Sequence, residues 1–226
     1  MKYDNLLNDE INKHVNKSYA KFHSGIVPNC KIRGVKIPIL REIAKMFSKY
    51  EDFLENISLD NYEAISVACY YIGLTTKDIS LLKSRLDFIL PYVNNWAICD
   101  TFVSSLKVLK KYKSSMYSTI LEYLNNNDDF IVRFGIVCLL SYYIDSNDIN
   151  ALLEKLTTIK TNCYYVDMAI AWFISVAFVK CRNETLIFLE NKRFNKIIHN
   201  KSMSKICDSF RVSTEDKMLV KSLKYS

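Results

Sequence analysis

Large aromatic side chains recur in this chain at a fixed interval of 34 residues, at Tyr62, Trp96, Phe130 and Tyr164. The segments that contain them align in this register without a gap: NYEAISVACYYIGL, NWAICDTFVSSLKV, DFIVRFGIVCLLSY and CYYVDMAIAWFISV. A period near 34 residues with two helices per unit is typical of α-solenoids of the tetratricopeptide or HEAT kind. The tetratricopeptide consensus of Trp, Leu-Gly and Ala-x-x-x-Phe is absent. We therefore predict an all-α fold, an α-solenoid of about six HEAT-like helix pairs.

Glycine and proline are scarce, with four Gly and three Pro in 226 residues, which disfavours a fold built from many tight turns. This length suits one sizeable core, so we predict a single HEAT-like repeat domain over residues 1–226. Local signals support individual helices. Pro38 fits the first turn of one helix, Asp128 or Asp129 fits the cap of another, and Ser213 begins a capping box.

Sequence motifs for secretion, membrane insertion, disulfide pairing and metal binding are absent, and this bears on the expected compartment and cofactors. The N-terminal segment MKYDNLLNDEINKH lacks the apolar core of a secretion signal, and the apolar run over residues 168–179 is too short to span a bilayer. Seven cysteines without a CxxC pair indicate neither a disulfide framework nor a zinc site. His14, His23 and His199 have no second ligand at metal spacing. We expect a monomer without metal or cofactor, in a bacterial-type cytoplasm and used at the nucleoid.

The aligned segments predict which side of each helix is buried. Projection at about 100° per residue gives three apolar columns that we expect to pack against partner helices. The columns are Ala64, Ile98, Val132 and Val166; Ala68, Phe102, Ile136 and Ile170; and Ile72, Leu106, Leu140 and Ile174.

The arc away from these columns carries Trp96, Asp100, Lys107 and Trp172, and we place Arg133 with them. Trp96 and Asp100 lie about one helical turn apart, so an indole and a carboxylate share one face. In a solenoid such an arc is a continuous binding surface, usually the concave one. We therefore expect a concave basic groove.

Each of these residues also has an ordinary interpretation. The tryptophans fit interhelical packing, Asp100 fits a solvated surface acid, and Lys107 fits a solvated helix end. Arg133 is harder to explain in this way, because an arginine inside an apolar helix needs a partner or an open groove. An exposed pair with Asp100 contributes only about 0–1 kcal/mol, so stability is a weak reason for these charges. We favour a functional site.

The formal net charge of +7, from 31 basic and 24 acidic residues, suits a polyanionic partner such as DNA. A lone carboxylate in a positive groove repels phosphate, so Asp100 needs another role. A carboxylate can align a water and stabilise positive charge on a sugar, as in glycoside hydrolysis. These residues point to cleavage of an N-glycosidic bond. Two alternatives stay open: a non-catalytic HEAT-repeat protein that binds distorted or branched DNA, and a protein-binding helical scaffold.

Five segments carry a resemblance to a known family: NNWAICDTF, DFIVRFGIVCLL, YYVDMAIAWFISVAFVK, KICDSFRVSTEDK and, near the start, RGVKIPILREIAK. In this order and spacing they resemble the AlkD-type alkylpurine DNA glycosylases. The resemblance extends from about Tyr19 to Leu223. It implies HEAT-like repeats around a concave DNA-binding groove, and removal of positively charged N3- and N7-alkylpurines from duplex DNA.

The resemblance also implies residue roles. Asp100 matches the family's catalytic acid, Arg133 its active-site arginine, and Trp96 and Trp172 its two groove tryptophans. These residues are expected to contact the deoxyribose and its phosphates, without the base flipping that most glycosylases use. Asp167 departs from the pattern, where a lysine is expected. Tyr19 and Phe22 are candidates near the lesion, and the candidate phosphate contacts are Lys36, Arg41, Lys107, Lys201, Lys205 and Arg211.

Overall fold

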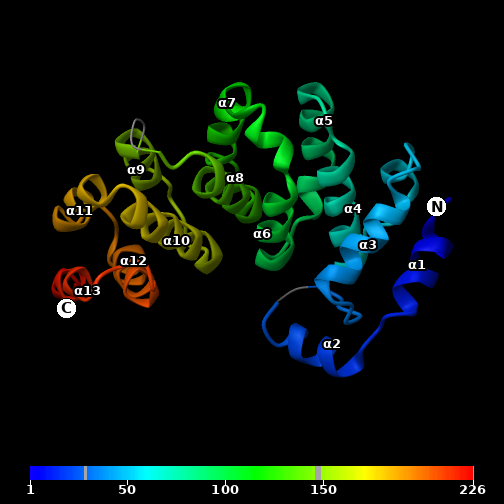
Figure 1. Cartoon of the computed structure of the whole chain (residues 1–226), viewed down its shortest axis with the longest axis horizontal. Coiled ribbons are helices and arrows are strands. Elements are labelled where there is room, and N and C mark those ends of the chain that lie inside the picture. Colours follow the sequence, from blue (N-terminus) through cyan, green and yellow to red (C-terminus); the bar gives the residue numbers. More distant parts are fainter. Residues whose placement is uncertain (28–29, 146–148, 226) are drawn as a thin grey trace. The chain divides into compact units, whose positions relative to one another are not determined.

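The computed structural model of the chain describes residues 1–27, 30–145 and 149–225. These residues form thirteen α-helices and three short 3-10 helices and contain no strand, which confirms the all-α prediction (Figure 1). Across the same ranges, no helix is long and apolar enough to cross a membrane. The chain divides into two compact units, residues 1–116 and 117–226, and the prediction of one repeat domain stays a prediction.

The first unit holds six complete helices and the start of a seventh, α7, within which the boundary between the units falls. Its elements are α1 (Asp4–Asn12), α2 (Lys17–Ser24), α3 (Ile37–Phe47), η1 (Leu54–Asn56), α4 (Tyr62–Thr75), α5 (Ile79–Ile89), η2 (Leu90–Tyr92), α6 (Trp96–Ser105), η3 (Lys107–Lys110) and α7 (Lys113–Tyr123). Helix α4 packs against both α3 and α6 (Figure 1). Every residue of α4 from Tyr62 to Ile72 is buried, so this helix forms the centre of the unit.

The second unit continues the all-helical pattern after α7. Its helices are α8 (Asp129–Tyr142), α9 (Ile149–Thr157), α10 (Tyr164–Lys180), α11 (Arg182–Glu190), α12 (Lys196–Asp208) and α13 (Thr214–Ser222). Helix α10 packs against both α8 and α12 (Figure 1). Nine consecutive residues of α8, from Val132 to Leu140, are buried. Together α8 and α10 supply close to half of the buried apolar residues described in this unit.

Side-chain caps start several helices where the sequence predicts them. Asn95 caps α6 by accepting a hydrogen bond from the backbone N–H of Ile98 at 3.0 Å. Asp128 caps α8, Ser213 caps α13, and Pro38 lies in the first turn of α3, which confirms these three predictions. Such caps satisfy backbone donors that the first turn of a helix leaves without a partner.

The 34-residue register correctly locates four helix starts. Tyr62, Trp96 and Tyr164 are the first residues of α4, α6 and α10, and Phe130 is the second residue of α8. All twelve residues of the three predicted apolar columns are buried, which confirms the columns.

The prediction for the opposite arc is correct only in part. Trp96, Asp100 and Trp172 are half-exposed as expected. Tyr62, which aligns with Trp96 in the 34-residue register, is buried, and the His23 ring of α2 lies edge-on to it at 4.7 Å. Arg133 is also buried, with 5% of its surface exposed, so its place on an exposed arc is wrong. Lys107 is exposed but lies outside the predicted helix, because α6 ends at Ser105.

A buried carboxylate holds the loop before α3 against α4. The Glu63 side chain, fully buried in the first turn of α4, accepts hydrogen bonds from the backbone N–H groups of Arg33, Gly34 and Val35 at 2.8–3.3 Å. Gly34 has a φ of +94°, and a Cβ there would lie 2.3 Å from the carbonyl oxygen of Asn16, the N-cap of α2. Glycine at this position therefore lets the loop approach the start of α2 closely.

We expect Glu63→Ala to lower the free energy of unfolding by about 2–4 kcal/mol, because it leaves several buried backbone donors without an acceptor. Glu63→Gln retains one acceptor oxygen and should cost less. Urea unfolding of the three proteins measures this difference. A loss below about 0.5 kcal/mol for Glu63→Ala, within the range of ordinary surface changes, would show that these bonds do not hold the loop.

The buried histidines make stability depend on pH. Burial lowers the pKa of His23 and of His199, so both are neutral in the folded protein, while the unfolded chain takes up protons near pH 6.5. Stability should therefore be constant above this pH and fall as the pH drops from about 6.5 toward the lower folded pKa values. Urea unfolding between pH 7.5 and 5.5 should show a smaller decrease for His23→Phe. The exposed His14, replaced by Gln, is the matched control and should behave as wild type.

Candidate functional site

The start of α6 presents an indole and a carboxylate together. Trp96 and Asp100 are both half-exposed and lie one turn apart on this helix. The Trp96 indole Nε1–H donates a hydrogen bond to the carbonyl oxygen of Ile26 at 3.0 Å. With its polar edge bonded in this way, the indole has a fixed orientation beside Asp100.

The same hydrogen bond brings the end of α2 to the start of α6, because Ile26 lies two residues beyond the end of α2. Helix α2 carries Tyr19, which is half-exposed, and Phe22, which is 63% exposed, with their ring centroids 6.4 Å apart. Ile26 is itself an exposed apolar residue. Within the first unit, Trp96 and the helix that carries the two lesion candidates thus meet. The contact of Ile26 was not predicted, and no sequence pattern marks it.

Two of the candidate phosphate contacts of this unit line one hollow of about 380 Å³. Arg41 and Lys107 line it together with Lys45, which lies one helical turn after Arg41 on α3, and with Ser104 and Ser105. The Arg41 guanidinium carbon lies 5.3 Å from the centroid of the Tyr70 ring, which orients it. Three cations around one hollow suit an anionic oxygen ligand, whereas the Ser104 and Ser105 hydroxyl groups already donate to the backbone carbonyls of Thr101 and Phe102. Sequence reasoning missed Lys45, although its spacing from Arg41 was the available signal.

The hollow also contains one acid, Glu42, and part of α4 at Gly73. A Cβ on Gly73 would lie 2.5 Å from the Ser105 hydroxyl oxygen, so the absence of a side chain allows α4 to approach the end of α6. Lys36, the other candidate in this region, is exposed at the N-cap of α3 and does not line the hollow.

In the second unit, Arg133 joins α8 to the first turn of α10. Its Nη1 donates a hydrogen bond to the carbonyl oxygen of Tyr165 at 2.6 Å. The partner that an arginine in an apolar helix needs is thus at least in part a backbone carbonyl, which carries no net charge. Trp172 lies farther along α10 and is half-exposed, in contrast to its buried neighbours Ala171 and Phe173.

Asp167 lies where the resemblance leads us to expect a lysine. Its side chain is buried in the first turns of α10, and its Oδ1 has no hydrogen-bond partner among the described residues. Burial raises the pKa of this carboxyl group above its ordinary value. This position therefore offers no cation to a phosphate.

The remaining cationic candidates lie at the C-terminal side of the second unit. Lys201 and Arg211 are exposed, and Lys205 is half-exposed. The Lys201 ammonium lies 5.9 Å from the centroid of the Tyr164 ring at the start of α10. Sequence reasoning missed Phe210, which is fully exposed beside Arg211 in the loop between α12 and α13.

Among the described residues, no three His, Cys, Asp or Glu side chains gather as a metal site would require. The expectation of an enzyme without metal or cofactor stays a prediction.

Comparison with known proteins places the chain in a family. A search of curated protein sequences found no match. The family model described as DNA alkylation repair enzyme matches residues 4–207, which include Trp96, Asp100, Arg133 and Trp172. The chain therefore belongs to the DNA alkylation repair enzyme family.

Proposed function

We propose that the protein is a DNA glycosylase that hydrolyses the N-glycosidic bond of positively charged N3- and N7-alkylpurines in duplex DNA. Membership of a DNA alkylation repair family supports a role in DNA repair. The observation that carries the reaction type is the half-exposed Asp100 carboxylate one turn after the oriented Trp96 indole, in a protein of net charge +7. An acid at this position would repel phosphate and so does not help a phosphate-binding surface. It can, however, stabilise positive charge that develops on a sugar.

The chemistry needs little more than a carboxylate and a water. As the bond between C1′ and the purine nitrogen breaks, its electron pair neutralises the positive charge of the alkylated base. The base therefore leaves without protonation by a general acid. The sugar is left with oxocarbenium character, which the Asp100 carboxylate stabilises. Asp100 also aligns the water that attacks C1′, and the proton released passes to this carboxylate or to solvent.

The other three residues hold the DNA backbone around the reacting sugar. We assign Trp96 and Trp172 to the deoxyribose faces, since an indole offers a flat apolar surface with one polar edge. Arg133 is buried and bonded to the Tyr165 carbonyl, so we assign to the neighbouring phosphate the attraction of its charge and not a direct contact. No base-binding pocket is required, because the base is already a good leaving group, and we propose that the lesion is not flipped out of the duplex.

DNA binding is assigned to the exposed cations and to repeated helix pairs. Arg41, Lys107 and the newly recognised Lys45 form the best-supported phosphate contact, because they line one hollow. Lys36, Lys201, Lys205 and Arg211 are assigned to further phosphates. We also propose that the helix pairs are HEAT-like repeats around a concave basic groove, a proposal supported by the spacing of the starts of α4, α6, α8 and α10.

We expect Asp100→Asn to lower the rate of 7-methylguanine release from methylated duplex DNA on the order of 100-fold, because the neutral amide no longer stabilises the sugar cation. DNA affinity should be retained. The matched control is Asp87→Asn, an exposed acid on α5, which should release base as wild type does. Equal release by Asp100→Asn and wild type would remove Asp100 from the mechanism. DNA binding by wild type without any release would favour the non-catalytic alternative.

Arg41→Gln combined with Lys107→Gln should weaken DNA binding at every sequence and reduce the slope of log affinity against log salt by about 2, one unit for each lost phosphate contact. Fluorescence anisotropy over a series of salt concentrations measures this slope. Lys83→Gln, an exposed cation on α5 outside the hollow, should leave the slope unchanged. An unchanged slope in the double variant would show that these two cations do not contact the backbone.

A further inference from the structure

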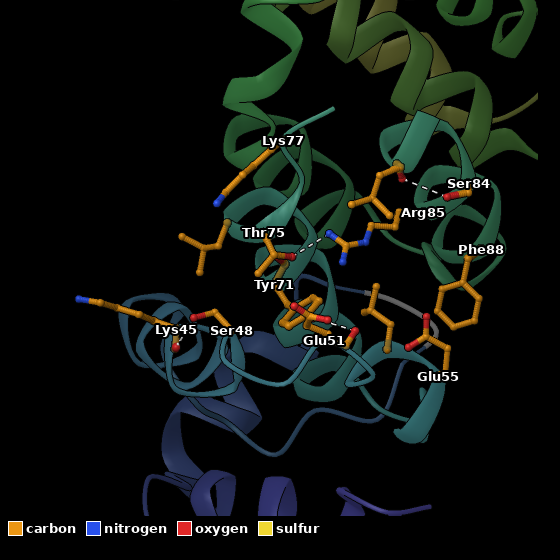
Figure 2. A pocket seen from close by; sticks show the side chains of 13 residues that line it. Lys45, Ser48, Glu51, Glu55, Tyr71, Thr75, Lys77, Ser84, Arg85 and Phe88 are labelled. Atoms are coloured by element: carbon orange, nitrogen blue, oxygen red, sulfur yellow. Dashed lines mark hydrogen bonds between the residues drawn. The ribbon is translucent and has the colours of Figure 1, made fainter. Parts of the chain in front are cut away.

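A second and larger hollow of about 800 Å³ lies in the first unit, between the end of α4, the helix α5 and the segment that follows α3. Figure 2 shows the side chains that line it. None of the residues assigned above to the deoxyribose lines this hollow, and neither do Lys36, Arg41 or Lys107. It shares Lys45 and Leu74 with the smaller hollow. Its volume falls in the range of sites for small molecules.

Arg85 of α5 is the central charged group of this hollow. Its Nη1 donates hydrogen bonds to the hydroxyl oxygens of Thr75 at 2.8 Å and Thr76 at 2.9 Å. Its guanidinium carbon lies 5.4 Å from the centroid of the Tyr71 ring. Figure 2 shows the guanidinium reaching toward Thr75 at the middle of the hollow. Two neutral hydroxyl groups and a ring therefore fix the position of a half-buried cation.

Among the described residues Arg85 makes no ion pair, and its Nη2 and Nε donate to no other group. A partly buried arginine normally pairs with a carboxylate, since a charge removed from water needs compensation. Arg85 keeps two donor groups in the fork geometry that suits a carboxylate or a phosphate.

The other charges are separated around the hollow. Lys45 and Lys77 are exposed and make no ion pair within the described ranges, and they lie on one side in Figure 2. Glu55 lies on the other side beside Phe88, and Glu51 lies between the two sides. An anionic group bound at Arg85 is therefore attracted by the lysines on one side and repelled by Glu55 on the other.

Apolar side chains complete the lining. Leu54, Leu74, Leu81 and Phe88 line the hollow, and Phe88 is exposed. A ligand that carries a ring or a short aliphatic body can cover these surfaces and remove apolar area from water.

We propose that this hollow is a binding site for a small amphipathic anion, in which a phosphate monoester or carboxylate contacts Arg85 and an apolar body lies against Leu81 and Phe88. Apart from Lys45, which lies at the edge shared with the smaller hollow, the residues of this site are not among those assigned to DNA. The proposal does not depend on the glycosylase reaction.

Titration of the whole protein with phenyl phosphate, benzoate and inorganic phosphate tests the proposal, with binding followed by calorimetry and by NMR shifts of the amides of residues 75–76 and 84–88. Phenyl phosphate or benzoate should bind about 10-fold more tightly than inorganic phosphate, because only these probes cover the apolar lining. Comparison of the two ring-bearing probes tells a phosphate-ester site from a carboxylate site, and binding of either supports the proposal.

Two variants separate the anionic and apolar parts of the site. Arg85→Gln should weaken every probe about 10-fold, whereas Phe88→Ala should remove only the advantage of the ring-bearing probes. Lys83→Gln removes a positive charge from the same helix outside the hollow and should bind as wild type. If Arg85→Gln does not fold, the same titrations are made with Phe88→Ala and Lys77→Gln, both of which change exposed residues. Absence of binding by both ring-bearing probes, or equal binding by wild type and the variants, would overturn the proposal.

Discussion

Helices α4 and α8 are buried along most of their length, and this burial decides where a charged side chain can lie. A charge inside such a helix is costly unless it has a partner. Glu63 is held by three backbone N–H groups, and Arg133 donates to the carbonyl of Tyr165. Each of these charges also joins its helix to a neighbouring segment. The buried helices thus tolerate few charges, and those present connect parts of one unit.

Apart from Arg133, the residues that we assign to the reaction lie where the helices meet solvent. In the first unit this is the start of α6, where Asp100 follows an indole whose N–H is already bonded to Ile26. The start of α2 is in turn fixed by the close approach of Gly34 to Asn16. We propose that these contacts help to hold the Asp100 carboxylate where it can stabilise charge on the sugar.

The sequence predicts most of the helical framework because the underlying rules are local. The 34-residue register locates the starts of α4, α6, α8 and α10, and the caps at Asp128 and Ser213 follow from residue type. Burial around a whole helix is not local. Three features depend on neighbouring segments. His23 covers Tyr62, α6 ends before Lys107, and Arg133 bonds to the carbonyl of Tyr165. The hollows around Arg41 and Arg85 escape prediction for the same reason, since residues far apart in the chain line them.

We propose that the protein acts on purines whose positive charge makes them good leaving groups. The most direct measurement compares release of 7-methylguanine with release of an uncharged lesion, O6-methylguanine, from otherwise identical duplexes. We expect the protein to release 7-methylguanine well above the spontaneous rate and to release no O6-methylguanine. Release of both lesions at similar rates would contradict this proposal, and so would release of 7-methylguanine at no more than the spontaneous rate.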